Sequence, residues 1–179
     1  MILIGLGANL DTKKFGPPRA ALGAALQEIE KSGMRIKQRS SWYQTAPVPA
    51  SKQPWYVNSV AELETYLSPK AIICALLELE KCFGRVRTVP NAPRILDLDL
   101  LAYNDLIIKG STPKDLTVPH PRVNGRSFVI IPLLEIAPNW RDPVSGKTIA
   151  NIAYQLPKGQ QTHKMKDEKG VFGSEWLTT

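Results

Sequence analysis

The chain has 179 residues, of which 43% are hydrophobic and 22% are charged. This length and composition predict one folded domain and exclude a disordered or collagen-like chain. The longest unbroken apolar run, Ala71 to Leu77, is far too short to span a bilayer. The apolar start of the chain, residues 1–7, has no basic segment before it, so it is typical of a buried strand rather than a signal peptide. We therefore expect a cytoplasmic protein with no membrane partner.

The net charge of +7 favours an anionic partner such as a nucleotide, a phosphorylated metabolite, a nucleic acid or a membrane surface. The basic residues are scattered, and no run of four or more Lys or Arg occurs, which argues against nucleic acid and membrane. The two cysteines, Cys74 and Cys82, lie about two turns apart in one predicted helix, too far for a disulfide. We expect both to be reduced, as is usual in the cytoplasm.

The first half of the chain alternates between strand and helix patterns. Residues 2–8 form an apolar run typical of a buried strand, and apolar side chains then recur at helical spacing between Pro18 and Gly33. The stretch 34–45 is rich in β-forming residues and the stretch 55–66 alternates loosely, so both predict strands. The three prolines between these two stretches predict an irregular loop.

The second half begins with a helix whose two ends are both marked. Ser68 and Pro69 predict an N-cap followed by a first-turn proline, and Gly84 predicts the end of the helix. A basic loop over 85–93 leads into the clearest strand, 94–103. The remaining predictions are a short partner strand over 106–109, helices over 127–136 and 148–155, and a polar tail over 157–179 to which no element is assigned.

The order of these elements is β-α-β-β-α-β followed by extras. Strands outnumber those of a simple β-α alternation, which favours an α+β fold with a mainly antiparallel sheet over a doubly wound parallel sheet. This unit is the ferredoxin-like arrangement. We expect it to form one domain over 1–156, with flanking helices, followed by the tail as a C-terminal extension.

The sharpest local feature is a pair of aspartates in the strand after the basic loop. Asp97 and Asp99 share one face of the strand, about 7 Å apart at the backbone. Two carboxylates on one face repel each other unless a cation lies between them, and Mg²⁺ prefers such oxygen ligands, usually together with substrate phosphates. The alternative is an exposed pair of solvated aspartates. The leucines that alternate with the pair face the core in either case: Leu96, Leu98 and Leu100.

Three arginines surround this pair in the sequence. Arg85 and Arg87 open the basic loop, and Arg94 closes it just before the aspartates. Arginine binds phosphate with two parallel hydrogen bonds and keeps its charge, so the set suits a metal–triphosphate complex. The alternative is a solvated basic loop.

Four more residues each leave two interpretations open. Glu80 lies at the border of an apolar helix stripe, where it forms an ion pair at the core edge or contacts a ligand. His120 is a structural residue or part of a site. Tyr56 and Asn58 share one strand face, which fits ordinary sheet packing or a pocket for a flat ligand.

Taken together, these residues resemble the 6-hydroxymethyl-7,8-dihydropterin pyrophosphokinase family of folate biosynthesis, over about residues 2–155. The combination of PRILDLDLL with LTVPHPR is the most specific part of the resemblance. The motifs that carry it are GxN at 7–9, SSWYQTAPV at 40–48, YVN at 56–58, ELEKCFGRVR at 78–87, PRILDLDLL at 93–101 and LTVPHPR at 116–122.

The resemblance implies the transfer of pyrophosphate from ATP to the hydroxymethyl oxygen of the pterin, with attack at the β-phosphorus and release of AMP. It implies two Mg²⁺ ions held by Asp97 and Asp99, and it implies that Arg85 and Arg94 are catalytic residues of a mobile loop. The ATP-binding residues that it implies are Glu80, Arg87, Leu100, Thr117, His120 and Arg126. The pterin pocket that it implies consists of Thr45, Val48, Asn58, and the sandwiching rings of Tyr56 and Phe128.

Two other functions compete with this one. Another Mg²⁺-dependent nucleotidyl- or glycosyl-transferase could use the same aspartate pair, and a nucleotidyltransferase would release pyrophosphate instead of AMP. A basic ferredoxin-like RNA-binding module would need stacked aromatic residues on adjacent strands, which the sequence does not offer. We therefore expect ATP and the pterin as small-molecule partners, no nucleic acid, and a monomer.

Overall fold

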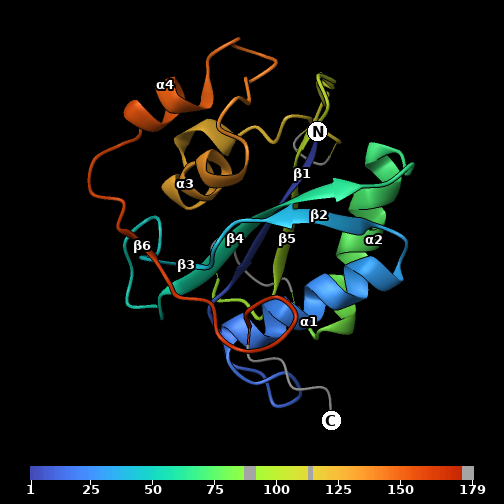
Figure 1. The fold of residues 1–179 in the computed structure, drawn as a ribbon, viewed down its shortest axis with the longest axis vertical. Helices are drawn as coiled ribbons and strands as arrows, with labels where there is room; N and C mark the ends of the chain where they lie inside the picture. The colour runs from blue at the N-terminus through green and yellow to red at the C-terminus, as the bar shows by residue number, and fades with distance from the viewer. Residues whose placement is uncertain (87–91, 113–114, 175–179) are drawn as a thin grey trace.

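The computed structural model describes residues 1–86, 92–112 and 115–174. Six strands form one sheet, in which β5, β1, β4, β3 and β6 are neighbours in that order and β2 also pairs with β4 (Figure 1). Every pairing is antiparallel. The strands are β1 (Ile2–Ala8), β2 (Arg35–Arg39), β3 (Tyr43–Thr45), β4 (Tyr56–Glu64), β5 (Asp97–Tyr103) and β6 (Thr162–Lys164).

Two long crossovers give the sheet its topology. Helix α1 (Pro18–Lys31) links β1 to β2, and helix α2 (Pro69–Cys82) links β4 to β5. Because β1 and β4 lie side by side at the centre, each crossover places its second strand one position beyond the other central strand. This is the split βαβ arrangement of the ferredoxin-like fold, and it confirms the predicted α+β class.

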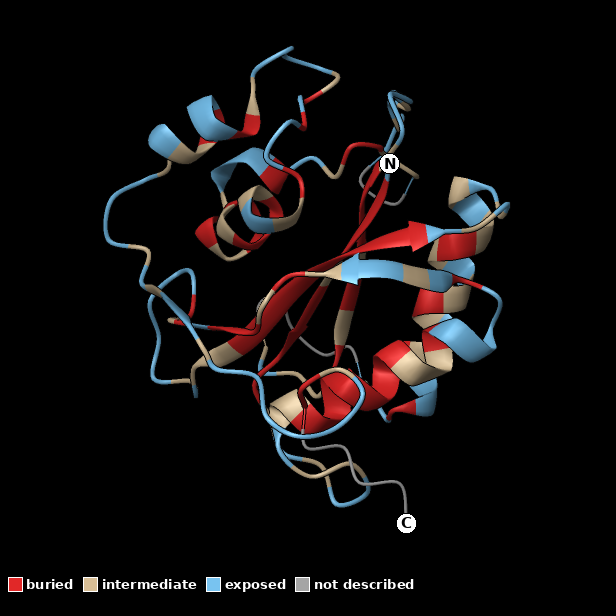
Figure 2. Ribbon diagram, viewed as in Figure 1, coloured by how far each residue is buried: buried red, intermediate tan, exposed pale blue. Residues whose placement is uncertain are grey.

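The helices cover both faces of the sheet (Figure 1). Helices α1 and α2 pack on one face, where alternate side chains of β1, such as Ile4 and Leu6, meet Leu26 and Leu76 from the helices. Helices α3 (Ser127–Ile136) and α4 (Ile149–Tyr154) cover part of the other face. The central strands are buried along most of their length (Figure 2), so the sheet is the rigid floor on which loop side chains are positioned.

The capping residues and glycines in the sequence predicted the ends of the helices correctly. The Ser68 hydroxyl accepts the Ala71 N–H at 3.3 Å, as an N-cap should, and Thr148 caps α4 in the same way. Gly33 and Gly84 follow α1 and α2 with φ of 84° and 85°, where a side chain would be strained.

The predicted strand 34–45 is two strands. Arg39 pairs with Ala61 and Tyr43 pairs with Asn58, so this side of the ladder holds one residue more than β4 does. The excess is absorbed at Ser40, whose hydroxyl accepts the Val60 N–H at 3.1 Å in place of a regular ladder bond. The chain therefore bends between β2 and β3 instead of running straight.

Three other boundaries differ from the predictions. The strand expected from residue 94 begins at Asp97, because the Arg94 backbone bonds to Asn9 at the end of β1 rather than to a ladder. The segment 106–109 is not a strand and makes a single bridge, between Ile108 and Val118. The polar tail contains β6, which pairs with β3. The division of the chain at residue 156 remains a prediction.

Candidate active site

The face of the sheet opposite α1 and α2 is left open at its centre by two glycines of β1. Gly5 lies opposite Asp99 and Gly7 lies opposite Asp97 in the ladder, and Gly7 also lies opposite Asn58. A Cβ atom at Gly7 would stand 2.7 Å from the Asn58 Oδ1 atom. The missing side chain at Gly7 is therefore what lets the Asn58 amide lie over β1.

A pocket of about 130 Å³ opens beside this point. Its walls come from β1, from the stretch 45–58 that runs from β3 to β4, from the start of β5 and from the first turn of α3, so four segments distant in the sequence converge on it. Its lining combines two aromatic rings with a few polar groups, which is typical of a site for a flat polar ligand. The lining residues are Gly7, Thr45, Ala46, Pro47, Val48, Pro49, Ser51, Gln53, Tyr56, Asn58, Arg94, Asp97, Arg126 and Phe128.

The polar groups of the pocket are fixed by hydrogen bonds. The Asn58 amide donates to the Thr45 hydroxyl at 2.7 Å, and both residues are buried. The Tyr56 hydroxyl donates to Gln53 Oε1 at 3.1 Å. Asn9 donates to the Pro54 carbonyl at 3.1 Å, which ties the loop to the end of β1. The pocket walls are therefore held in place before any ligand binds.

Asp97 lies at the inner end of this pocket and is paired with two arginines. Arg94 Nη1 donates to Asp97 Oδ2 at 2.7 Å, and Arg85 Nη1 donates to Asp97 Oδ1 at 2.5 Å. Burial by itself would raise the pKa of Asp97, but the charges of Arg85 and Arg94 and their hydrogen bonds hold it below its ordinary value. Asp97 is therefore an ionised carboxylate.

The pKa of Asp99 is shifted in the opposite direction. Burial and the neighbouring charge of Asp97 both raise the pKa of Asp99, and His120 and Arg126 only partly oppose them. Among the described residues, the guanidinium nearest to Asp99 is that of Arg126, at 3.9 Å. A carboxylate that lacks a close counter-charge and lies beside another carboxylate is suited to hold a cation.

Glu80 connects helix α2 to Arg85 and to strand β5 beside the two aspartates. Its side chain is 2% exposed, and Oε1 accepts the Leu98 N–H at 2.8 Å and a hydrogen bond from Arg85. The contact with Leu98 fixes β5 against the helix, and the contact with Arg85 aims that guanidinium at Asp97. In the ligand-free chain, Glu80 therefore forms the ion pair at the core edge, and its assignment to ATP binding stays a prediction.

A second and larger cavity, a groove of about 930 Å³, runs along the outer edge of β5. One side is helix α2 and the other is the segment 115–122, which Ile108 and Val118 brace through two backbone hydrogen bonds. Asp99 lies on its border. The lining residues are Lys70, Ile73, Cys74, Leu77, Leu98, Asp99, Leu100, Asp115, Leu116, Thr117, His120, Pro121 and Arg122.

His120 is oriented within this groove. Its backbone N–H donates to the Leu101 carbonyl at 2.8 Å, and its Nδ1 atom accepts the Arg122 N–H at 3.1 Å. Burial lowers the pKa of His120; Asp99 opposes this shift, and Arg126 and Arg122 add to it. The ring is therefore neutral at pH 7, with the proton on Nε2, which makes Nε2 a hydrogen-bond donor.

The structure thus brings most of the predicted site residues together in two neighbouring cavities. Thr45, Val48, Tyr56, Asn58 and Phe128 line the pocket, as Arg94, Asp97 and Arg126 also do. Leu100, Thr117 and His120 line the groove with Asp99. Glu80 and Arg85 lie beneath the aspartates, and Arg87 falls outside the described residues.

The sequence reasoning missed Gln53 and the role of Asn9. Gln53 lies in a proline-rich loop with no periodicity, and its contacts with Tyr56 and Asn9 reveal it. Asn9 belongs to the GxN motif, and its Oδ1 accepts the Arg94 N–H at 2.8 Å. An asparagine directly after an apolar strand, at the end of a glycine-containing motif, is the signal that the sequence offers.

Comparison with known proteins agrees with this geometry. The family model described as 7,8-dihydro-6-hydroxymethylpterin-pyrophosphokinase (HPPK) matches residues 3–138. A 2-amino-4-hydroxy-6-hydroxymethyldihydropteridine pyrophosphokinase of Haemophilus influenzae is 40% identical over 163 residues, which are 90% of this chain and 94% of that protein. A protein of the same name from Synechocystis is 39% identical over 155 residues, 86% of this chain and 75% of that protein.

A longer relative matches in part. The folic acid synthesis protein fol1 of Pneumocystis carinii is 34% identical over 151 residues, which are 84% of this chain but 19% of that protein. The match with the family model extends from β1 to the end of α3 and so includes both cavities. The chain belongs to the 7,8-dihydro-6-hydroxymethylpterin-pyrophosphokinase family.

Proposed function

We propose that this chain transfers a pyrophosphoryl group from ATP to the hydroxymethyl group of 6-hydroxymethyl-7,8-dihydropterin and releases AMP. The single observation that carries the proposal is the position of the two aspartates. Asp97 lines the small pocket and Asp99 lines the large groove. A donor in the groove and an acceptor in the pocket would therefore meet at this carboxylate pair.

The pocket suits the pterin. A flat heterocycle gains most of its binding affinity from stacking on aromatic faces and from a few well-oriented hydrogen bonds. Tyr56 and Phe128 supply the rings, and Asn58 and Thr45 supply polar groups that are already oriented. We assign the ring stacking to Tyr56 and Phe128, and the recognition of the ring edge to Asn58 and Thr45, with Val48 closing one side.

The groove suits ATP. Its volume and its mixed lining fit a nucleoside with a phosphate tail, and the tail would point toward Asp99. Neutral His120 and Thr117 offer a hydrogen-bond donor each, and Leu100 offers an apolar surface. We assign these residues, with Glu80, Arg87 and Arg126, to ATP binding.

The donor set fits Mg²⁺. Among the described residues no three His, Cys, Asp or Glu side chains gather into a metal site, so Asp97 and Asp99 are the carboxylates available. Mg²⁺ commonly takes one or two carboxylates and completes its shell with phosphate oxygens and water, which is what two ions here would do. When bound, Mg²⁺ neutralises charge on the triphosphate and aligns it.

The reaction needs alignment rather than a covalent protein intermediate. The hydroxymethyl oxygen forms a bond to the β-phosphorus, the bond from that phosphorus to the oxygen of the α-phosphate breaks, AMP leaves, and the hydroxyl proton passes to water. Arg85 and Arg94 neutralise Asp97 when no ligand is bound. We assign to both arginines the transfer of their hydrogen bonds to the phosphates as the transition state forms.

Product analysis tests the proposal. The protein is incubated with ATP, Mg²⁺ and the dihydropterin, and the phosphorus-containing products are followed by ³¹P NMR. AMP together with a pyrophosphorylated pterin is expected in equal amounts. Pyrophosphate release would indicate a nucleotidyltransferase, and ATP left unconsumed beside salt-sensitive RNA binding would indicate an RNA-binding module.

We also assign the protein to the cytoplasm, as a monomer that binds no nucleic acid. Among the described residues, no helix has the length and apolar character needed to cross a membrane. Light scattering during gel filtration should give the mass of one chain, and a mass of two chains would overturn the monomer.

A further inference from the structure

Helix α3 begins without a side-chain cap of its own. Its N-cap residue is Arg126, whose side chain makes no capping hydrogen bond and instead stands 3.9 Å from Asp99. The first N–H groups of a helix have no acceptor within the helix and need one from elsewhere. Ser127 carries the first of these groups, and it is buried.

Gln160, from the segment after α4, supplies the missing acceptor. Its side-chain Oε1 accepts the Ser127 N–H at 2.8 Å, and its Nε2 donates to the Gly125 carbonyl at 2.9 Å. One amide group therefore bonds to the backbone on both sides of Arg126. Such a contact fixes the backbone of Arg126 while leaving its guanidinium available.

Two neighbours of Gln160 strengthen this connection. The Thr162 and Ser127 hydroxyls are hydrogen-bonded at 2.8 Å. On the opposite side, the Gln161 carbonyl accepts the Ala46 N–H at 3.2 Å, and Ala46 lines the pocket. The segment 160–162 thus joins two walls of the pocket, the start of α3 and the loop after β3.

The residues on either side of Ser127 are the ones that face the pocket. Arg126 and Phe128 both line it, and the guanidinium of Arg126 lies over the ring of Phe128 at 5.3 Å from its centroid. A change in the first turn of α3 would move both groups together. We propose that Gln160 is a positioning residue: it caps α3 from a distant segment and so sets the placement of Arg126 and Phe128 against the pterin.

This inference rests on the proposed function, because that function identifies the pterin as the ligand of the pocket. Gln160 itself does not line the pocket, so its effect would be exerted through the first turn of α3. Truncation of Gln160 to alanine removes both hydrogen bonds to this turn without adding bulk. We therefore expect binding of the pterin to weaken more than binding of ATP.

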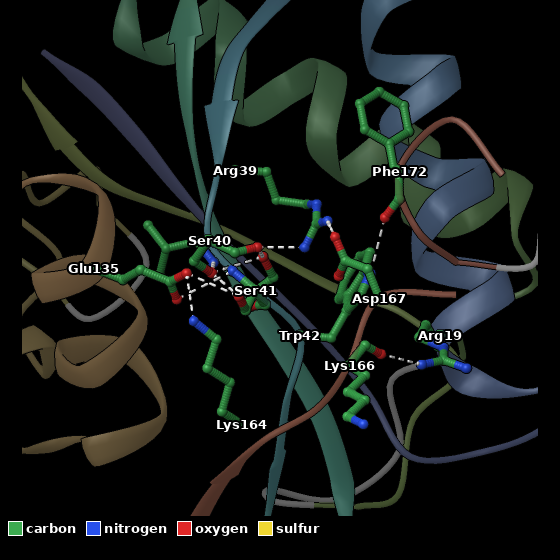
Figure 3. Close-up of polar contacts among 12 residues, drawn as sticks. Arg19, Arg39, Ser40, Ser41, Trp42, Glu135, Lys164, Lys166, Asp167 and Phe172 are labelled. Atoms are coloured by element: carbon green, nitrogen blue, oxygen red, sulfur yellow. Dashed lines mark hydrogen bonds and ion pairs between the residues drawn. The ribbon is translucent and has the colours of Figure 1, made fainter. Parts of the chain in front are cut away.

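The rest of the tail has anchors of its own (Figure 3), and the residues that form them do not line the pocket. Arg39 pairs with Asp167 at 2.8 Å, and the Trp42 indole donates to the Phe172 carbonyl at 2.9 Å. Arg19 of α1 donates to the Lys166 carbonyl at 3.0 Å. These contacts keep the tail in place when Gln160 is changed, and Asp167→Asn provides a matched control in the same segment.

The experiment measures dissociation constants for the dihydropterin and for a non-hydrolysable ATP analogue with Mg²⁺, together with KM, kcat and Tm. In Gln160→Ala, the pterin Kd and KM should rise about threefold to tenfold, the range of losing a helix cap. The Kd of the ATP analogue should rise less than that of the pterin, because Arg126 is one of several residues assigned to ATP binding, whereas Phe128 is one of the two rings of the pterin pocket. Asp167→Asn should leave both dissociation constants unchanged. Gln160→Glu keeps an acceptor for the Ser127 N–H at a helix N-terminus but replaces the donor to the Gly125 carbonyl with a second oxygen, so it should recover part of the lost affinity.

Three results would overturn the inference. The first is a lower Tm in Gln160→Ala with unchanged pterin affinity, which would make the residue merely structural. The second is an equal loss for both ligands, and the third is a Gln160→Glu variant as weak as Gln160→Ala. Failure of the proposed function looks different, because then the wild-type chain would neither bind the pterin nor convert it.

Discussion

At the scale of single residues, Asp97 and Asp99 stand two positions apart in opposite electrostatic environments. Asp97 is held ionised by Arg85 and Arg94, whereas burial and the charge of Asp97 raise the pKa of Asp99. In the ligand-free chain, the charge of Asp99 therefore opposes folding and the charge of Asp97 favours it. Stability and activity should respond differently to the two residues.

Neutralising the two aspartates separates these effects. We expect Asp97→Asn and Asp99→Asn each to lower turnover by at least about 10²-fold, the scale of losing one electrostatic stabiliser. Asp97→Asn should also lower Tm, because two arginines lose their partner. Asp99→Asn should raise Tm, because like-charge repulsion disappears. Thermal melts without ligand check this, and a similar fall of Tm in both variants would contradict it.

Gly7 gives a steric prediction. Gly7→Ala places a methyl group 2.7 Å from the Asn58 Oδ1 atom, whereas the same change at Gly5 meets the flexible end of Leu101 at 3.3 Å. Displacing a buried group costs about 1–3 kcal/mol, so we expect pterin affinity to fall roughly tenfold in Gly7→Ala. Gly5→Ala is the matched control and should change affinity little. Calorimetry decides, and equal effects at both glycines would argue against the Asn58 assignment.

Arg94 tests whether the arginines act mainly in the reacting state. An interaction made only in the transition state lowers kcat without weakening the binding of the ground state. We therefore expect Arg94→Ala to lower kcat far more than it weakens ATP binding, while Arg87→Ala acts more on ATP affinity. Arg35→Ala, at an exposed ion pair with Glu64, is the control. Single-turnover rates and ATP affinities measure both quantities, and proportional losses in Arg94→Ala would refute the assignment.

At the scale of elements, Glu135 joins the end of α3 to the strands beside the pocket (Figure 3). Its carboxylate accepts hydrogen bonds from the Tyr43 hydroxyl at 2.7 Å, from the Ser41 hydroxyl at 2.8 Å and from the Lys164 ammonium at 3.1 Å. Gln160 holds the first turn of the same helix. Both ends of α3 are therefore fastened to strands β3 and β6 or to the segments next to them.

Because the pKa of Glu135 is shifted, the contribution of this connection to the stability of the fold depends on pH. Burial would raise the pKa, but the hydrogen bonds from Tyr43, Ser41 and Lys164 lower it below its ordinary value of 4.5. A depressed folded-state pKa contributes stability above the unfolded value, and this contribution is lost as pH falls through the folded value. Glu135→Gln should therefore lower Tm at about pH 7, and the difference in Tm from the wild type should shrink as the pH falls below 4.5. A constant Tm difference across this range would contradict the assignment.

At the scale of the whole molecule, the two faces of the sheet have separate roles. One face packs α1 and α2 into the larger core, and the other carries α3, the glycines and the two aspartates. The small pocket therefore lies next to the rigid centre of the fold, and the groove lies at the edge of the sheet between β5 and α2. Ligand binding in these two cavities should stabilise the whole chain rather than a single loop.

Metal removal tests this coupling. An ATP analogue at about 100 times its Kd should stabilise the chain by about 2.7 kcal/mol, which is roughly 5–10 °C in Tm for a chain of this size. Chelating Mg²⁺ should remove most of this shift, because the triphosphate then meets the aspartates without a bridging cation. A full shift in excess EDTA would mean that the nucleotide binds independently of the carboxylates.

Much of the fold could be predicted from the sequence because its signals were local, whereas most residues of the candidate site were predicted from the resemblance to a known family. Period-two alternation places Asp97 and Asp99 on one face, and Ser68 and Gly84 mark the ends of α2. The missed features depend on partners far away in the chain. The division into two strands at Ser40 depends on the pairing with β4. The partner of Gln160 is Ser127, which lies 33 residues earlier in the chain.

Strand β6 has a consequence for how the chain behaves in concentrated solution. Without it, β3 would be the last strand on its side of the sheet and would present unpaired backbone groups next to the pocket. Exposed strand edges recruit strands of other molecules and start aggregation. Strand β6 covers this edge with three residues only, and the charged stretch 166–169 follows it. We therefore expect β6 and the charged stretch after it to hinder self-association. A chain shortened before residue 160 should then form particles that light scattering detects.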